Sequence, residues 1–379
     1  MIAKRVRDIP PSGIRRFFEL ASKEKDIVTL GVGEPDFDTP YSVKDKGLEA
    51  IELNYTHYTS NSGLLELREK ISEKLKKEND VGVSPEEILI TSGSSEGLDI
   101  ALRAILEEGN EVLIPDPAYV AYGPLVQLAG GKPVFIPTTE KNEFRVKAED
   151  MKKKITKKTK AVLFCSPNNP TGSVLTKEDL GDIADLAIKH DLVVISDEIY
   201  EKLIYEGEHY SIASFKGMRE RTITLNGFSK AYAATGWRVG YAAAKGELME
   251  AIYKIHQYCM LCAPTPSQYA MLAAFGEEES VRRMVKMYDA RRKLLVKGLN
   301  EINGISCHMP KGAFYAFPNI TETGLSSEKF AEKLIKEAKV AVVPGSVFGP
   351  SGEGFVRCSY SVSTESIIEA LDRIAKVFS

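Results

Sequence analysis

The 379-residue chain has few cysteines, no long apolar run and no dominant sign of charge. Its five cysteines are odd in number and scattered, which argues against a disulfide framework and fits a reducing cytoplasm. Basic and acidic residues are interspersed at a net charge of −3, so no patch favours nucleic acid or an anionic membrane. No segment approaches the roughly 18 apolar residues of a membrane span, and no apolar run follows the charged N-terminus. We expect a cytoplasmic protein that binds neither nucleic acid nor a membrane.

One cysteine pair has the spacing of a metal ligand set. Cys259 and Cys262 form a lone Cys-x-x-Cys, and only His256 lies nearby in sequence. A zinc site needs two further ligands, so we interpret the pair as structural and keep a metal site as the lesser alternative.

Short apolar runs alternate with amphipathic segments through the middle of the chain. The expected strands are Ile88–Thr91, Glu111–Ile114, Lys132–Ile136, Lys160–Cys165, Leu192–Ser196, Thr222–Leu225 and Arg238–Ala243. The expected helices between them are Glu96–Leu106, Tyr119–Leu128 and Lys177–Lys189. Continuously apolar strands separated by helices indicate an α/β fold with a mainly parallel central sheet flanked by helices. Such sheets bind ligands at the carboxyl ends of their strands.

The pattern changes after residue 275. A long charged helix over Glu279–Asn303 precedes short strands near Phe314–Phe317, Val340–Val343 and Phe355–Cys358, and helices over Ser327–Glu337 and Glu365–Phe378. This pattern predicts a smaller α+β domain over 276–379, beside a large domain over 41–275. Residues 1–40, with a helix over Ser12–Lys23, form an N-terminal arm that we expect to pack with the small domain.

Small residues follow the first expected strand. Ser94 and Ser95 lie in Ser-Gly-Ser-Ser-Glu-Gly, directly before a helix, where backbone N–H groups can bind phosphate. The alternative is an ordinary capped turn between strand and helix. A Walker loop is excluded, because no Gly-Lys-Ser/Thr follows.

Polar residues follow two further strands. Asn169 lies in Ser-Pro-Asn-Asn-Pro-Thr-Gly, where two prolines fix the backbone and present its amide. Asp197 and Tyr200 could address two edges of one aromatic ring, a ring nitrogen and a phenolic oxygen. The alternatives are a helix N-cap for Asp197 and a half-buried core position for Tyr200.

A lysine and an arginine follow the strand over Thr222–Leu225. Lys230 lies in a turn of small residues, where burial would lower its pKa and free its amine for a Schiff base. Arg238, eight residues later, suits a phosphate. The alternative is an exposed lysine and arginine flanking a glycine turn.

These motifs occur in an order that resembles a known family. Asn169-Pro-Thr-Gly, Ser-Asp197-Glu-Ile-Tyr200 and Ser229-Lys230 with Arg238 resemble the class I/II aminotransferases of pyridoxal 5′-phosphate (PLP) fold type I, closest to archaeal-type aspartate and aromatic enzymes. The likeness covers nearly the full length. It includes Gly-Glu-Pro-Asp-Phe from Gly33, Tyr58 in His-Tyr-Thr-Ser, and Phe-Val-Arg ending at Arg357.

The resemblance implies roles for the residues around the cofactor ring. Lys230 would hold PLP as an aldimine and later move the substrate proton, in a ping-pong reaction. Asp197 would pair with the ring nitrogen, Tyr200 and Asn169 would bind the ring oxygen, and Tyr119 would stack on the ring face.

The resemblance also implies a phosphate site shared between subunits. The backbone of Ser94 and Ser95, together with Arg238, would bind the phosphate. Gly227 stands where many relatives carry a phosphate-binding serine, so either Ser229 supplies a side chain to the phosphate or no serine side chain does. Tyr58 would reach the phosphate of the neighbouring subunit, so a homodimer with shared active sites is expected.

Arg357 would clamp the substrate α-carboxylate, helped by the Gly33 backbone and by Asn169 and Tyr119. The implied reaction moves an amino group from an L-amino acid to a 2-oxo acid such as 2-oxoglutarate. Aspartate is the first expected donor, although Ser95 stands where one acidic-substrate branch has lysine. Aromatic or broad specificity stays open as a close second.

Two other interpretations remain. A PLP-dependent C–S lyase would keep the fold and the cofactor but eliminate a thiol from cysteine derivatives. A binding or regulatory protein would keep the scaffold alone. We rank it last, because regulators of this family carry an added DNA-binding domain, and no basic helix-turn-helix segment is present in the chain.

Overall fold

A seven-stranded sheet forms the centre of the computed structural model, which describes residues 2–9, 11, 13, 14, 17, 19, 22 and 24–378. The strands lie in the order β2-β8-β7-β6-β5-β3-β4. They are β2 (Ile88–Thr91), β3 (Glu111–Asp116), β4 (Lys132–Pro137), β5 (Thr159–Cys165), β6 (Val193–Asp197), β7 (Thr222–Gly227) and β8 (Gly240–Ala243). All seven expected strands are confirmed, with ends displaced by a residue or two.

The sheet is mainly parallel, as expected. β4, β3, β5, β6 and β7 pair in parallel, whereas β8 runs antiparallel to both of its neighbours, β7 and β2. The carboxyl ends of β5, β6 and β7 therefore meet at one edge of the sheet. Asn169, Asp197 and Lys230 all lie in or directly after these strand ends.

Both faces of the sheet are covered by helices. Along β5, Ala161 and Leu163 belong to the core that includes α5 (Ser94–Ile105) and α6 (Tyr122–Leu128). Val162 and Phe164 belong to the core that includes α8 (Lys177–Lys189). Side chains alternate between faces along a strand, so a run that is apolar at every position buries both faces. Each fully buried Leu or Ile contributes about 2 kcal/mol.

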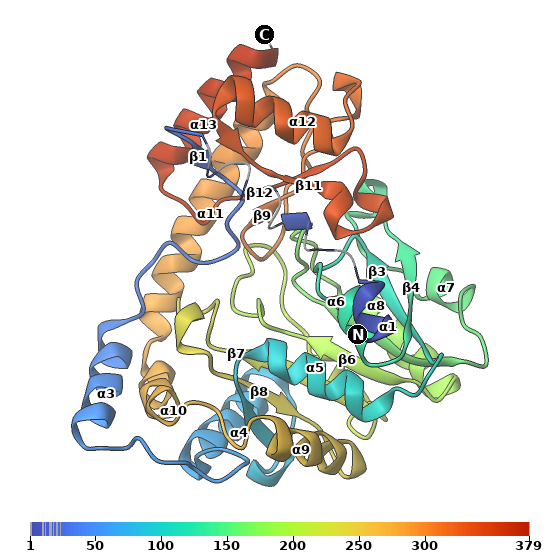
Figure 1. Cartoon of the computed structure of the whole chain (residues 1–379), viewed down its shortest axis with the longest axis vertical. Helices are drawn as coiled ribbons and strands as arrows, with labels where there is room; N and C mark the ends of the chain where they lie inside the picture. Colours follow the sequence, from blue (N-terminus) through green and yellow to red (C-terminus); the bar gives the residue numbers. More distant parts are fainter. Residues whose placement is uncertain are drawn as a thin grey trace.

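Several helices were not predicted from the sequence. They are α3 (Tyr41–Glu52), α4 (Leu65–Asn79), α9 (Glu247–Cys259) and α10 (Thr265–Leu272), beside the short α1 (Lys4–Arg7) and α7 (Ala148–Lys152). In α4 the signal was present, because Leu67, Ile71 and Leu75 recur every fourth residue and are all buried. α4 and α9 pack at the β2–β8 end of the sheet, at the base of Figure 1.

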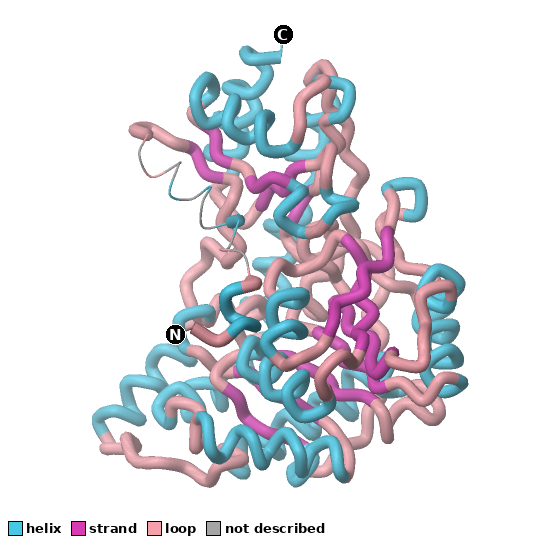
Figure 2. The backbone as a smooth tube through the Cα atoms, turned by 45° about the vertical axis from the view of Figure 1, so that its right-hand side comes forward, coloured by secondary structure: helices cyan, strands magenta, loops and turns pink. Residues whose placement is uncertain are grey.

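A smaller α/β layer stands above the large sheet. The long α11 (Glu278–Asn300) runs from the level of the sheet to α13 (Thr364–Phe378), as Figure 1 shows in orange and red. Figure 2 shows the small strands separated from the large sheet. Here β9 (Tyr315–Ala316), β11 (Val343–Pro344) and β12 (Val356–Ser359) pair antiparallel in the order β11-β12-β9. α12 (Ser327–Lys333) continues as a π-helix over Leu334–Ala338.

The N-terminal segment joins this smaller layer. β1 (Val28–Thr29) pairs in parallel with β10 (Val340–Ala341). The helix expected over Ser12–Lys23 lies largely outside the described residues, of which Gly13, Ile14, Phe17 and Glu19 are helical. Within the described part of the chain, every helix is too short or too polar to cross a membrane.

Candidate functional site

A cavity of about 310 Å³ opens at the carboxyl edge of the parallel strands. Its lining includes every candidate site residue from the sequence except Tyr58. These are Gly33, Ser94, Ser95, Tyr119, Asn169, Asp197, Tyr200, Ser229, Lys230, Arg238 and Arg357. These residues are spread over the sequence from 33 to 357, so the fold brings distant segments together at one cavity.

Lys230 lies in the turn that follows β7. Its Nζ donates a hydrogen bond to the carbonyl oxygen of Gly33 at 2.7 Å. Burial lowers the pKa of Lys230 to about 8, an effect that outweighs the raising influence of nearby Glu34. A lysine with this pKa has a substantial neutral fraction near physiological pH, so its amine can act as a nucleophile or a base.

Asp197 ends β6 with its carboxylate in the cavity. Its Oδ2 accepts from the Tyr122 hydroxyl at 2.7 Å, and its Oδ1 accepts from the backbone of Ile199 at 3.3 Å. Burial raises the pKa of Asp197 to about 6. Among the described residues, no lysine or arginine forms an ion pair with it. No helix begins here, so the N-cap interpretation is wrong.

Arg357, on β12, reaches down from the small sheet and is 3% exposed. Its Nη1 donates to Asn169 Oδ1 at 3.0 Å, and its Nη2 donates to the carbonyl oxygen of Gly31 at 2.7 Å. The guanidinium lies over the Tyr315 ring, 4.4 Å from its centroid. Its Nε is buried, and no described residue forms a hydrogen bond with it. The guanidinium therefore holds a buried positive charge that a carboxylate could neutralise.

Four tyrosines line the cavity. The hydroxyls of Tyr200 and Tyr315 lie 2.9 Å apart, and burial raises the pKa of both phenols. Tyr119 packs edge-on against Tyr122, with ring centroids 5.5 Å apart. Tyr200 is 4% exposed, so it is a core residue as well as a cavity residue.

The amino end of α5 forms a cradle at the other end of the cavity. Ser94 begins the helix two residues earlier than the sequence indicated, and Arg238 Nη2 approaches the Ser92 carbonyl oxygen at 3.4 Å. A Cβ on Gly240 would lie 2.5 Å from the Ser94 backbone nitrogen. The backbone therefore passes unusually close here. Free N–H groups at a helix start, beside an arginine, suit a phosphate.

Two sequence candidates lie elsewhere. Tyr58 lies in the loop after α3, 80% exposed and outside this cavity. The Cys259 and Cys262 thiols are free. His256 does not join them, because its Nδ1 pairs with Glu96 at 2.6 Å.

The sequence analysis missed several cavity residues. They are Ile14, Tyr122, Cys165, Ile199, Thr235 and Tyr315. Cys165 and Ile199 border strand ends that were recognised, so proximity to those motifs could have suggested them. Tyr122 and Tyr315 gave no local signal, because each meets its partner only across the fold.

Comparisons with known proteins show the family of this chain. The model of the family "Aminotransferase class I and II" matches residues 25–374. An aspartate aminotransferase of Pyrococcus abyssi is 53% identical over 374 residues, which cover 97% of this chain and 96% of that protein. An aromatic-amino-acid aminotransferase of Thermococcus litoralis is 49% identical over 381 residues, 99% of this chain and 98% of that protein. An aromatic aminotransferase structure from Pyrococcus horikoshii matches with a TM-score of 0.91 at 51% identity, over 95% of this chain and 98% of that one.

Proposed function

This chain belongs to the class I and II aminotransferases, and we propose that it uses PLP to move the amino group of an L-amino acid to a 2-oxo acid. The observation that carries the proposal is that Lys230 and Asp197 line the same cavity. Lys230 is an amine with its pKa lowered to about 8, and Asp197 is a buried carboxylate that forms no ion pair with any described residue.

The cavity fits this cofactor. Asp197 lacks the counter-charge that a protonated ring nitrogen would supply, and the α5 cradle is too tight for a Cβ at Gly240. Asp197 would hold the ring nitrogen, with Tyr200 and Asn169 at the ring oxygen and Tyr119 on the ring face. The phosphate would lie against Ser94, Ser95, Ser229 and Arg238. When bound, PLP supplies an electron sink for negative charge at the substrate α-carbon.

The protein's own groups perform the remaining work. Nζ of Lys230 would hold the cofactor, and the same amine, once freed, would serve as the base that accepts the proton of the substrate α-carbon. The Asp197 carboxylate keeps the ring nitrogen protonated. Arg357 orients the substrate by its α-carboxylate, with Gly33, Asn169 and Tyr119 around it. The amino donor and the oxo-acid acceptor use the same cavity in turn, which gives ping-pong kinetics.

Aspartate is the proposed first donor, aromatic amino acids are a close second, and 2-oxoglutarate is the proposed acceptor. The support is that relatives at 53% and 49% identity are named for aspartate and for aromatic amino acids. Single-turnover spectra with a panel of amino acids rank the donors directly.

We also propose a cytoplasmic homodimer, with an arm (1–40), a large domain (41–275) and a small domain (276–379). The β1–β10 pairing supports an arm that packs with the small domain. The free cysteines fit a reducing compartment. Large exposed side chains on α3 and the following loop support a contact between subunits: Tyr41, Leu48, Ile51, Leu53, Tyr55 and Tyr58.

One substitution tests the proposal. Lys230→Ala removes the reactive amine, and we expect multiple-turnover transamination to be abolished. Borohydride treatment of the PLP-loaded wild type, followed by peptide mapping, should place the label on residue 230. Substantial turnover in the variant, or a label on another lysine, would contradict the proposal.

A further inference from the structure

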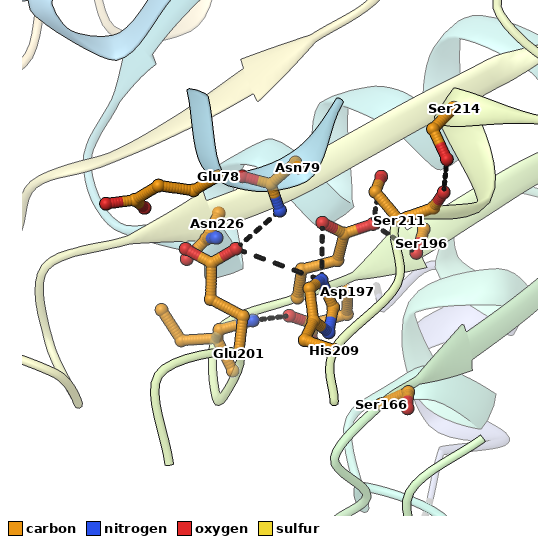
Figure 3. A network of polar contacts seen from close by, with 12 residues as sticks. Glu78, Asn79, Ser166, Ser196, Asp197, Glu201, His209, Ser211, Ser214 and Asn226 are labelled. Carbon is orange, nitrogen blue, oxygen red and sulfur yellow. Dashed lines mark hydrogen bonds and ion pairs between the residues drawn. The ribbon is translucent and has the colours of Figure 1, made fainter. Parts of the chain in front are cut away.

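A buried charge network lies directly behind Asp197. The next residue, Glu198, is 1% exposed and does not line the cavity. Its Oε1 accepts from the hydroxyls of Ser196 at 3.0 Å and Ser211 at 2.7 Å. Its Oε2 lies 3.2 Å from Nε2 of His209. Figure 3 shows His209 between the loop that carries Ser211 and the side chain of Glu201.

Glu201 forms the other half of the network. Its carboxylate binds the Lys74 ammonium and accepts from Asn79 Nδ2 at 2.8 Å. Its Oε2 also lies 3.8 Å from His209 Nε2. Lys74 therefore neutralises Glu201. Among the described residues, His209 is the only basic side chain within ion-pair distance of Glu198.

The hydrogen bond to Glu198 determines which ring nitrogen of His209 carries a hydrogen. A carboxylate accepts but does not donate, so Nε2 of His209 must carry the hydrogen that points to Glu198. Burial alone would lower the pKa of His209. The hydrogen bond to Glu198 and the negative charges of Glu198 and Glu201 raise this pKa above its ordinary value, although the positive charge of Lys74 opposes them. The imidazolium form thus balances a network of two carboxylates and one ammonium.

This balance bears on the cavity, because Asp197 and Glu198 are consecutive buried carboxylates. The charge of Glu198 raises the pKa of Asp197, so ionising both carboxyl groups is disfavoured. Tyr122, Lys230, Tyr119 and Cys165 also face Asp197, and of these only Lys230 can be positively charged. Lys230 must be neutral to act as a nucleophile, so it cannot supply a permanent counter-charge.

We propose that His209 is a positioning residue for cofactor binding: its imidazolium neutralises Glu198 and so allows Asp197 to stay ionised beside the cofactor ring nitrogen. This inference rests on the proposed PLP site. His209 itself touches neither the cavity nor its contents. Its effect passes through Glu198 and the end of β6.

The first test uses the wild-type protein without cofactor. The chain has five histidines, so ¹⁵N-histidine NMR resolves them, and loss of one signal in His209→Gln assigns residue 209. We expect the shifts of an imidazolium to persist above the ordinary histidine pKa of about 6.5. A neutral imidazole for His209 at pH 6.5 would overturn the proposal.

The second test measures PLP affinity against pH, by quenching of the single tryptophan, Trp237, or by absorbance. His209→Gln keeps an N–H donor but removes the positive charge of the imidazolium, which leaves Glu198 unneutralised. The pH below which PLP affinity falls should therefore rise by about one unit. The double variant Glu198→Gln/His209→Gln removes both charges and should restore the wild-type midpoint. His308→Gln, at a surface site 3.8 Å from Glu143, is the matched control and should change nothing.

The outcomes separate the inference from the function it rests on. If wild type does not bind PLP, the proposed function fails. Suppose wild type binds PLP but His209→Gln and His308→Gln have the wild-type pH midpoint of PLP affinity, or the double variant does not return to that midpoint. The inference then fails while the proposed function stands. If His209→Gln does not fold, Glu198→Gln decides, because a midpoint that moves to lower pH supports the proposal and any other result overturns it.

Discussion

The hydroxyl of Tyr122 donates a hydrogen bond of 2.7 Å to the carboxylate of Asp197. The two residues lie 75 positions apart, on α6 and at the end of β6. This bond favours the charged form of Asp197 and opposes the burial that raises its pKa to about 6. We therefore expect Tyr122 to act on the cofactor site through Asp197.

Tyr122→Phe should weaken PLP binding. Losing one hydrogen bond to a carboxylate costs about 1.5 kcal/mol, or about tenfold in affinity. It also raises the pKa of Asp197, so the loss should be greater at pH 6 than at pH 8. Titration of the cofactor-free protein at both pH values measures this. Tyr210→Phe, which removes a hydroxyl that donates to Glu208 on the surface, is the control. A loss independent of pH would show that Tyr122 only packs.

The strands and the strand-end motifs were predictable because their signals are local. Each central strand is a short apolar run bounded by turn residues, and a parallel sheet brings the following loops to one edge. Asn169, Asp197 and Lys230 therefore lie together as expected. Their roles toward a cofactor remain predictions.

The contacts that complete the cavity were not predictable, because they depend on how distant elements pack. Tyr315 meets Tyr200 only when the small sheet lies over the large one. The sequence placed the Gly33 backbone beside Arg357, and in the structure a Cβ on Gly33 would lie 3.7 Å from Arg357 Nη2. The hydrogen bonds could not be predicted: the carbonyl oxygen of Gly31 accepts from Arg357, and that of Gly33 accepts from Lys230.

The reactivity of Lys230 should follow its lowered pKa. An ordinary lysine titrates near about 10.4, whereas burial brings Lys230 to about 8. The neutral, nucleophilic form therefore appears as the pH rises through about 8. Competitive acetylation of the cofactor-free protein, read by peptide mass spectrometry, should give this midpoint. A midpoint near 10 would show that burial does not activate the amine.

Arg357→Lys should weaken the binding of every amino-acid donor. A lysine cannot reproduce the two-pronged guanidinium contact, and the lost charged hydrogen bond costs about 2 kcal/mol, or about 30-fold in KM. Single turnover with L-phenylalanine should slow accordingly, whereas phenethylamine, which lacks the carboxylate, should react as with wild type. Arg282→Lys, in an exposed pair with Glu279, is the matched control. Equal losses for both amines would place the α-carboxylate elsewhere.

Gly240→Ala should damage the α5 cradle. The added Cβ would lie 2.5 Å from the Ser94 nitrogen and 2.6 Å from the Gly93 carbonyl carbon, both of them backbone atoms that cannot rotate away. We expect the free energy of unfolding to fall by about 2 kcal/mol and PLP affinity to fall at least tenfold. Gly236→Ala is the control, because no heavy atom of the described residues beyond its two chain neighbours would lie within 4 Å of its added Cβ. Denaturant unfolding and PLP titration compare the two variants. Wild-type PLP affinity in Gly240→Ala would exclude the α5 cradle as the phosphate site.

Tyr58 distinguishes a shared active site from a self-contained one. Its side chain is 80% exposed and outside the cavity of its own chain, so any role at the phosphate requires a second copy. Tyr58→Phe should therefore weaken PLP binding. Mixing it with Lys230→Ala should form hybrid dimers in which one site combines an intact Lys230 with an intact Tyr58. We expect that site to recover wild-type affinity and turnover. If mixing leaves the Tyr58→Phe defect unchanged while mass spectrometry shows that hybrids form, Tyr58 does not act across the interface.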